Sequence, residues 1–185
     1  MMNYTRSTSP QHTQGFTLVE TLVAIAILMI AIVGPYYSVQ QAITASYVSR
    51  DSLIATSLAQ EGAEYIYFIR DNNYLATPSN LWTQGMDNCL VSMHPYGCTV
   101  DPSQTLPANA LAYCTSSVCP ALNLNTTSGI YTQAAGSPAT KFTRTVKVTA
   151  VPSHPEEMII TSQVSWTTNH SSYTTTVTEN IYNWL

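Results

Sequence analysis

Residues 15–32 read GFTLVETLVAIAILMIAI, and this stretch decides how the rest of the chain is organised. From residue 16 to residue 33 the chain is apolar except for Thr17, Glu20 and Thr21. A run of this length is about what a helix needs to cross the hydrocarbon core of a bilayer. A carboxylate within such a run is costly and is usually retained for a partner. We therefore expect a membrane-inserted helix in which Glu20 meets a cationic group.

The sequence GFTLVE, followed by the apolar run, resembles the processing site of type IV pilins and type II secretion pseudopilins. The resemblance implies that a prepilin peptidase cuts after Gly15 and methylates the new terminal residue, Phe16. It also implies that Glu20 neutralises the terminal amine of a neighbouring subunit during assembly. The expected partners are therefore the peptidase, other pilin subunits and, before assembly, the cytoplasmic membrane.

A charge argument supports this pattern independently. Cleavage before Phe16 would create an amine with a reference pKa near 8, which is mostly protonated at neutral pH. Opposite charges about 4 Å apart gain about 4 kcal/mol at an effective dielectric constant of about 20. Phe16 and Glu20 are one helical turn apart, so pairing within one chain and pairing between subunits are both open. Pairing between subunits would fix the axial stagger of a filament.

Two simpler interpretations compete with this one. An ordinary secretory signal ends in small residues after the apolar run, but here Gly34 and Pro35 follow it without an A-x-A pattern. A plain membrane anchor explains the hydrophobicity and leaves the order of Gly15, Phe16 and Glu20 unexplained. The leader, residues 1–15, has one basic residue, whereas pilin leaders are usually basic close to the glycine. We therefore expect slower cleavage and an orientation only weakly set by positive charge.

The pair Gly34 and Pro35 predicts a kink or local unwinding, because proline removes a helix hydrogen bond and clashes with the preceding turn. The pattern is helical again from residue 36 to residue 69, where apolar residues recur every 11 positions along one face. We expect one long helix over residues 16–70, with a membrane or filament-core segment at about 16–37. The apolar stripe is expected at Ile43, Ile54, Tyr65, Tyr47, Leu58 and Ile69, with Ala55, Ala59 and Ala63 beside it and Arg50, Asp51, Glu61 and Glu64 elsewhere.

Residues 71–140 are predicted to form an irregular region, opened by the helix-ending Asp71, Asn72 and Asn73 and rich in proline and glycine. Short strands are expected only at residues 90–93 and 129–131. All four cysteines lie here, and on the outer side of the membrane they are expected to form disulfides. Of three connectivities, we favour Cys89 with Cys98 and Cys114 with Cys119, because each closes a short loop.

Two metal alternatives exist in this region. Zinc would need Cys89, His94, Cys98 and a further ligand, but no tight C-x-x-C pair is present. Calcium would need carboxylates such as Asp71, Asp87 and Asp101, but their spacing is not that of a calcium loop. We expect no metal and no cofactor.

Residues 141–185 read as β-structure, with period-2 alternation in three runs separated by short turns. The runs cover residues 142–151, 158–167 and 173–184, and they predict an antiparallel meander. One apolar face would pack on the second half of the helix and the threonine-rich face would meet solvent. The fold class is therefore α+β, with a long N-terminal helix on a C-terminal antiparallel sheet, as the pilin resemblance also implies.

Composition and motifs narrow the function. Charged residues make up 9% of the 185 residues, well below the usual quarter, and the net charge is −4, which argues against nonspecific nucleic-acid binding. No G-x-S-x-G, H-E-x-x-H or Walker motif occurs, so we expect an assembly protein and not an enzyme. Residues 58–73, LAQEGAEYIYFIRDNN, are similar to minor pilins and pseudopilins that initiate or cap filaments. A pseudopilin of a secretion or DNA-uptake machine, and a membrane-anchored extracellular binding module, remain alternatives.

Overall fold

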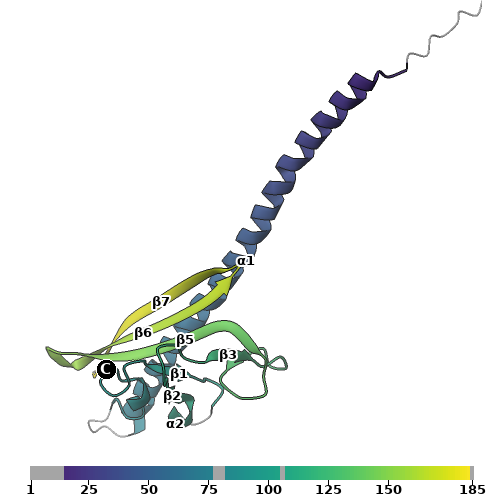
Figure 1. Ribbon diagram of the computed structural model, residues 1–185. Helices are drawn as coiled ribbons and strands as arrows, with labels where there is room; N and C mark the ends of the chain where they lie inside the picture. The colour runs from purple at the N-terminus through teal and green to yellow at the C-terminus, as the bar shows by residue number, and fades with distance from the viewer. Residues whose placement is uncertain (1–14, 77–81, 105–106, 184–185) are drawn as a thin grey trace, which may run out of the picture. The chain divides into compact units, whose positions relative to one another are not determined.

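The computed structural model describes residues 15–76, 82–104 and 107–183, and a long helix followed by a sheet dominates it (Figure 1). The helix is α1 (Leu18–Ala76). The chain divides into two compact units, Met1–Ala45 and Ser46–Leu185, and each is described by itself. We call residues 15–45 the stem and residues 46–183 the head.

The stem is helical from Leu18 onward, and every residue from 15 to 45 is exposed. It belongs to the one described helix that is long and apolar enough to cross a membrane, with an 18-residue window of mean hydropathy 2.4 that has no buried residue. Gly34 and Pro35 both lie inside α1. The bend expected at these two residues stays a prediction.

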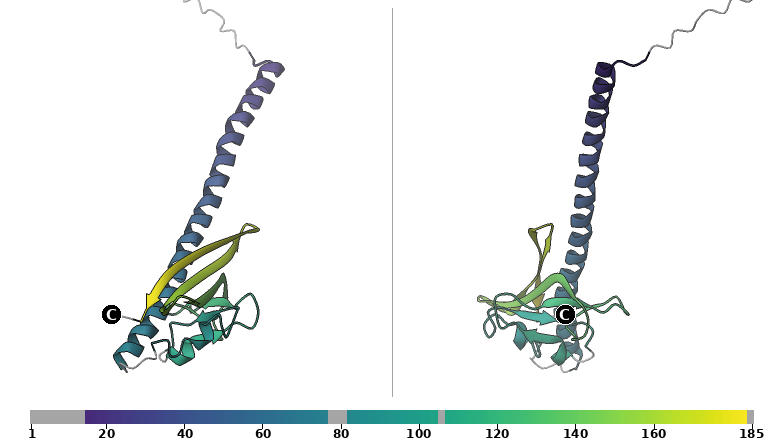
Figure 2. Two further views of the ribbon diagram at one scale, coloured as in Figure 1. Left: turned by 90° about the vertical axis from the view of Figure 1, so that its left-hand side faces the viewer. Right: turned by 45° about the vertical axis from the view of Figure 1, so that its right-hand side comes forward.

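The head contains one seven-stranded sheet in which all paired strands are antiparallel (Figures 1 and 2). Its strands are β1 (Cys98–Val100), β2 (Leu111–Tyr113), β3 (Ala121–Leu124), β4 (Tyr131–Thr132), β5 (Ala139–Val151), β6 (His154–Thr168) and β7 (Ser171–Tyr182). Two short helices, η1 (Asp87–Cys89) and α2 (Pro107–Ala110), lie in the connections. β5 is the central strand: it pairs with β6 on one edge and with β1 and β3 on the other.

The predicted meander is confirmed by β5, β6 and β7. Thr143 pairs with Ser165, and Ser165 in turn with Thr174. The register of β6 with β7 is unbroken, whereas that of β5 with β6 shifts between Ala150 and Val151. Alternation places one set of side chains against the second half of α1 and the other set toward solvent. The inward set on these strands is Phe142, Arg144, Val146, Val148, Ile160, Ser162, Val164, Trp166 and Ile181, all buried.

Half of the buried residues of α1 are small. Ala55, Ala59 and Ala63 are fully buried, and Gly62 lies between them. A Cβ atom added to Gly62 would lie 2.5 Å from Ser162 Oγ, so the helix approaches β6 closely there. Large residues such as Ile66 and Ile69 of α1 pack in the same core cluster as Ala63.

Three expectations about the helix were wrong. The pattern put Asp51 on the polar side, but it is 1% exposed. It put Tyr47 on the packed stripe, but half of that residue is exposed. The helix was expected to end at Asp71, but it continues to Ala76. The extra turn is held because Asn73 Nδ2 donates to the carbonyl oxygens of Trp82 at 3.0 Å and Gln84 at 2.8 Å.

The region predicted to be irregular also needs correction, because it supplies the four short strands β1 to β4. No strand forms at residues 90–93; Leu90 makes a single bridge to Val148 and then a turn, in which His94 N donates to Leu90 O at 2.8 Å. The strand expected at 129–131 is β4, which begins two residues later. Residue 184, the predicted end of the last strand, lies outside the described residues.

Candidate functional site

The predicted processing segment lies at the start of the stem, immediately before α1. Gly15, Phe16 and Thr17 are not helical, and the helix begins at Leu18. Thr17 caps it: its Oγ1 accepts a hydrogen bond from Glu20 N at 3.3 Å. Thr-x-x-Glu before an apolar run is a capping-box sequence that fixes a helix start. The spacing of Thr17 and Glu20 is thus a sequence signal that places the helix start at Leu18, two residues after the predicted start at Phe16.

The Gly15–Phe16 peptide bond lies between two exposed residues. Phe16 is 81% exposed. A Cβ atom placed on Gly15 would meet nothing within 4 Å. Because the bond precedes the helix cap, a peptidase could bind an extended segment there without unwinding α1. Cleavage would leave a two-residue extension, Phe16 and Thr17, before the first helical residue.

Glu20 lies in the first turn of α1 and is exposed. A carboxylate in this position is favoured by the positive end of the helix dipole. Among the ion pairs between described residues, none involves Glu20. The side chain is therefore available to a cation from outside the described chain, whether a new terminal amine or another molecule.

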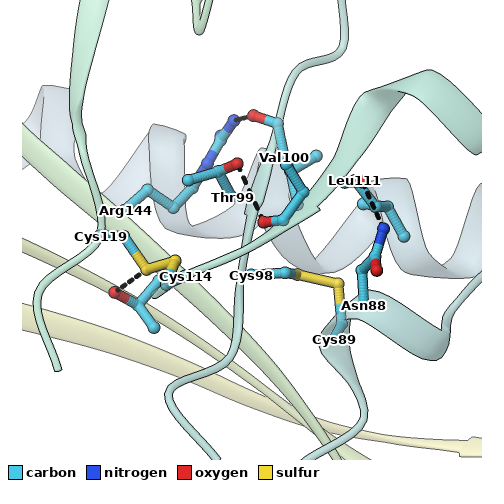
Figure 3. Close-up of a disulfide and its surroundings, with 11 residues drawn as sticks. Asn88, Cys89, Cys98, Thr99, Val100, Leu111, Cys114, Cys119 and Arg144 are labelled. Atoms are coloured by element: carbon cyan, nitrogen blue, oxygen red, sulfur yellow. Dashed lines mark hydrogen bonds between the residues drawn. A yellow bond between two sulfur atoms is a disulfide. The ribbon is translucent and has the colours of Figure 1, made fainter. Parts of the chain in front are cut away.

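The four cysteines of the head form the two disulfides favoured from loop length (Figure 3). Cys89 is bonded to Cys98, and Cys114 to Cys119. All four residues are buried. Because Cys89 and Cys98 are bonded to each other, they cannot act as thiolate ligands, and the zinc alternative fails.

Arg144 joins three segments of the head from a fully buried position on β5 (Figure 3). Its Nη1 donates to Leu58 O at 2.8 Å and to Glu61 Oε2 at 2.6 Å, both on α1. Its Nη2 donates to Val100 O on β1 at 2.7 Å. The alternation of β5 placed this cation on the inner face, but its partners could not be read from the sequence.

Asp51 is one of two buried carboxylates among the described residues of the head, the other being Asp101. Its carboxylate accepts hydrogen bonds from Lys141 Nζ and from Thr168 Oγ1. Burial acts to raise the pKa of Asp51, but the bonds from Lys141 and Thr168 outweigh it and hold the pKa below its ordinary value. This cluster ties the beginning of the helical part of the head to the tip of the β6–β7 hairpin.

Asp101 holds the loops beyond β1 together. Its carboxylate accepts bonds from the hydroxyl of Ser103 at 2.6 Å, from that of Thr132 at 2.9 Å, and from Gln133 N at 3.1 Å. Burial acts to raise the pKa of Asp101, but the hydrogen bonds from Ser103 and Thr132 hold it below its ordinary value. Within the described residues, no three His, Cys, Asp or Glu side chains gather to hold a metal ion.

Comparison with known proteins identifies the N-terminal segment alone. Residues 11–34 match the family described as the prokaryotic N-terminal methylation motif, the type IV prepilin-type signature. Neither curated proteins nor solved structures gave a match to the chain. The matched segment contains the exposed Gly15–Phe16 bond, the Thr17 cap and Glu20, so signature and geometry coincide at one site.

Proposed function

We propose that this chain is the precursor of a structural subunit of a type IV pilus-like filament, cut between Gly15 and Phe16 and methylated on Phe16. The observation that carries the proposal is the coincidence of the methylation motif at residues 11–34 with an exposed bond just before a capped apolar helix. The motif points to a structural subunit and not to an enzyme. On this proposal the chain resides in the cytoplasmic membrane as a single-pass protein before assembly and in a surface or periplasmic filament afterwards.

The stem is an apolar surface that other stems would have to cover in a filament. Its large apolar side chains are all exposed, among them Leu22, Ile27 and Ile32, each more than half exposed. Leaving the membrane would expose this surface to water unless other stems cover it, and burial of apolar surface gains about 25 cal/mol per Å². The amine of Phe16 and the carboxylate of Glu20 would be buried with it, so their mutual neutralisation is a condition of packing.

The decisive experiment is mass spectrometry of the protein isolated from its native membrane or filament. The proposal expects a chain that begins at Phe16 and carries one added methyl group on its terminal amine. A chain that retains residues 1–15, or that begins after residue 33, contradicts the proposal.

Glu20→Val tests assembly separately from processing. We expect this variant to be inserted and cleaved normally, because the bond and the apolar run are retained, but to enter filaments poorly, because the terminal amine of a neighbour is then buried without a counter-charge. Glu64→Gln is the matched control, since Glu64 is an exposed acid on the same helix. Normal incorporation of Glu20→Val would contradict the role given to Glu20.

Within this class we propose a minor subunit. The support is the similarity of residues 58–73 to minor pilins and to pseudopilins that initiate or cap filaments. A low copy number in sheared surface filaments is the result expected for a minor pilin. A pseudopilin of a secretion or DNA-uptake machine would share the stem and would be lost from sheared surface fractions. A membrane-anchored binding module would remain in the membrane as an unassembled chain.

A further inference from the structure

The outer edge of β7 is a long strand edge without a neighbour. β7 pairs with β6 alone, and no described strand lies beyond it (Figures 1 and 2). Its register with β6 continues without a shift from Ser171 to Tyr182. None of the residues 171–180 is buried. The described strands at the far margins of the sheet, β2 and β4, have only three and two residues.

Part of this edge is capped by the helix of the head. Tyr67 donates from its hydroxyl to Asn180 O at 2.8 Å, and Arg70 Nη1 donates to Tyr182 O at 3.5 Å. The N–H and C=O of a strand residue point to the same side, and the side alternates along the strand. Residues two apart on β7 therefore point to the same edge as Asn180 and Tyr182, and these are Ser172, Thr174, Thr176 and Thr178. No described residue outside β7 forms a hydrogen bond with the main-chain groups of these four residues.

The open part of the edge lacks the devices that usually prevent strand pairing. Natural edge strands are protected by lysine, proline, bulges or short length. Residues 171–178 read SSYTTTVT, with neither charge nor proline, and most of them are β-branched or aromatic residues that favour strands. An extended partner could add to this edge through main-chain hydrogen bonds.

We propose that the partner is the same edge of a second copy of this chain, paired antiparallel about a two-fold axis at Thr175. In this register Thr174 lies opposite Thr176 of the second copy, and Ser172 lies opposite Thr178. These are the residues whose N–H and C=O groups point outward, so each pair exchanges two hydrogen bonds. The pairing uses all of the uncapped edge and none of the part that Tyr67 and Arg70 occupy.

The side chains are complementary in the same register. Tyr173 of one copy faces Val177 of the other, an aromatic and β-branched pair of the kind that stabilises antiparallel strands. A two-fold axis at Thr176 would place Tyr173 opposite Glu179 and Ser172 opposite Asn180, whose carbonyl is already bonded. The axis at Thr175 therefore gives the longer and better matched ladder.

This contact goes beyond the proposed function and does not depend on it. A two-fold contact uses the same surface on both copies and closes on itself, so it pairs subunits and does not extend a filament. It assigns the head an interaction surface separate from the stem, through which the heads of two copies are held together.

Cysteine cross-linking of the full-length chain in membranes tests the pairing. Thr175 sits on the axis, where a non-hydrogen-bonded pair has Cα atoms about 4.5 Å apart, within the range that a disulfide spans. Thr175→Cys is expected to give a disulfide-linked dimer on mild oxidation. Ser171→Cys is the matched control on the same strand, because the two copies of residue 171 would lie about 27 Å apart at about 3.4 Å per residue, and it is expected to stay monomeric.

Charge substitutions check the register in the Thr175→Cys background. Thr174→Lys with Thr176→Lys puts like charges opposite each other across the axis and is expected to abolish the dimer. Thr174→Lys with Thr176→Glu puts opposite charges there and is expected to restore it, which a merely misfolded head would not do. Adding Glu20→Val should leave the dimer unchanged.

Three results would overturn the proposal. The first is a Thr175→Cys chain that reacts with a maleimide but gives no dimer. The second is equal cross-linking of Ser171→Cys, which would mean random collision. The third is loss of the dimer on adding Glu20→Val, which would mean that filament assembly, and not the β7 edge, brings the heads together.

Discussion

Gly62 offers the sharpest test of how the helix and sheet of the head fit together. In an ordinary helix interior, replacing glycine by alanine stabilises the helix by about 0.8–1.0 kcal/mol. Here the new Cβ atom would lie 2.5 Å from Ser162 Oγ, 3.0 Å from Arg144 Cδ and 3.1 Å from Val146 Cγ2. Relieving such overpacking typically costs about 1–3 kcal/mol. We expect Gly62→Ala to destabilise the head by a net value of up to about 2 kcal/mol.

The atom responsible can be identified by a second substitution. Ser162 Oγ is buried and has no hydrogen-bond partner among the described residues. Ser162→Ala removes the nearest obstacle and an unpaired hydroxyl, so alone it should be neutral or slightly stabilising. In that background we expect Gly62→Ala to cost about 1 kcal/mol less than in the wild type, a coupling typical of residues in contact.

Urea unfolding of the full-length chain in detergent micelles, followed by tryptophan fluorescence, measures these differences. Trp82 and Trp166 are both buried, so unfolding of the head changes their environment. A shift of the midpoint at constant slope reports stability. A higher midpoint for Gly62→Ala, or an equal loss with and without Ser162, would refute the close contact between α1 and β6.

Three further outcomes are expected from the head. Replacing Cys89 and Cys98 together by serine should cost about 2–4 kcal/mol in the same urea assay, whereas an unchanged midpoint would mean that the loop is held by packing alone. Hydrogen bonds lower the pKa of Asp101 in the folded state. Its stabilising contribution is therefore present above the unfolded pKa of about 4 and is lost as the pH falls through the folded pKa. Asp101→Asn should flatten the plot of unfolding free energy against pH below pH about 4, and an unaltered slope would contradict this. Lys141→Met should cost about 1–3 kcal/mol by leaving the carboxylate of Asp51 without its main donor, and Asp51→Asn in the same chain should recover part of the loss; no recovery would mean that Lys141 acts through other contacts.

The sequence indicated most of what depends on local pattern. The alternation of residues 142–151 predicted a strand with two distinct faces, because a strand has a fixed period of two. Loop length favoured the pairing of Cys89 with Cys98. The apolar run with Gly15 and Glu20 indicated the processing site, because that signal lies in residue order and needs no distant contact.

What depends on contacts between distant segments could not be predicted. The burial of Asp51 requires Lys141 and Thr168, which lie 90 and 117 residues away in the chain. The extra turn of α1 depends on Asn73 meeting Trp82 and Gln84 across a loop. Strands as short as β1 and β4 have no period of their own and form because β5 and β3 offer them main-chain partners.

The guanidinium of Arg144 has a mechanical consequence. It holds Leu58 O and Glu61 of the helix and Val100 O of β1 while sitting in the middle strand of the sheet. Separating the helix from the sheet near Arg144 would leave this buried cation without its partners on the helix. Removing the partner of a buried charge typically costs about 3–5 kcal/mol. A pulling force applied along α1 within the head is therefore shared with the sheet. We expect the head to unfold under force in one cooperative step, and not by the loss of one helical turn after another.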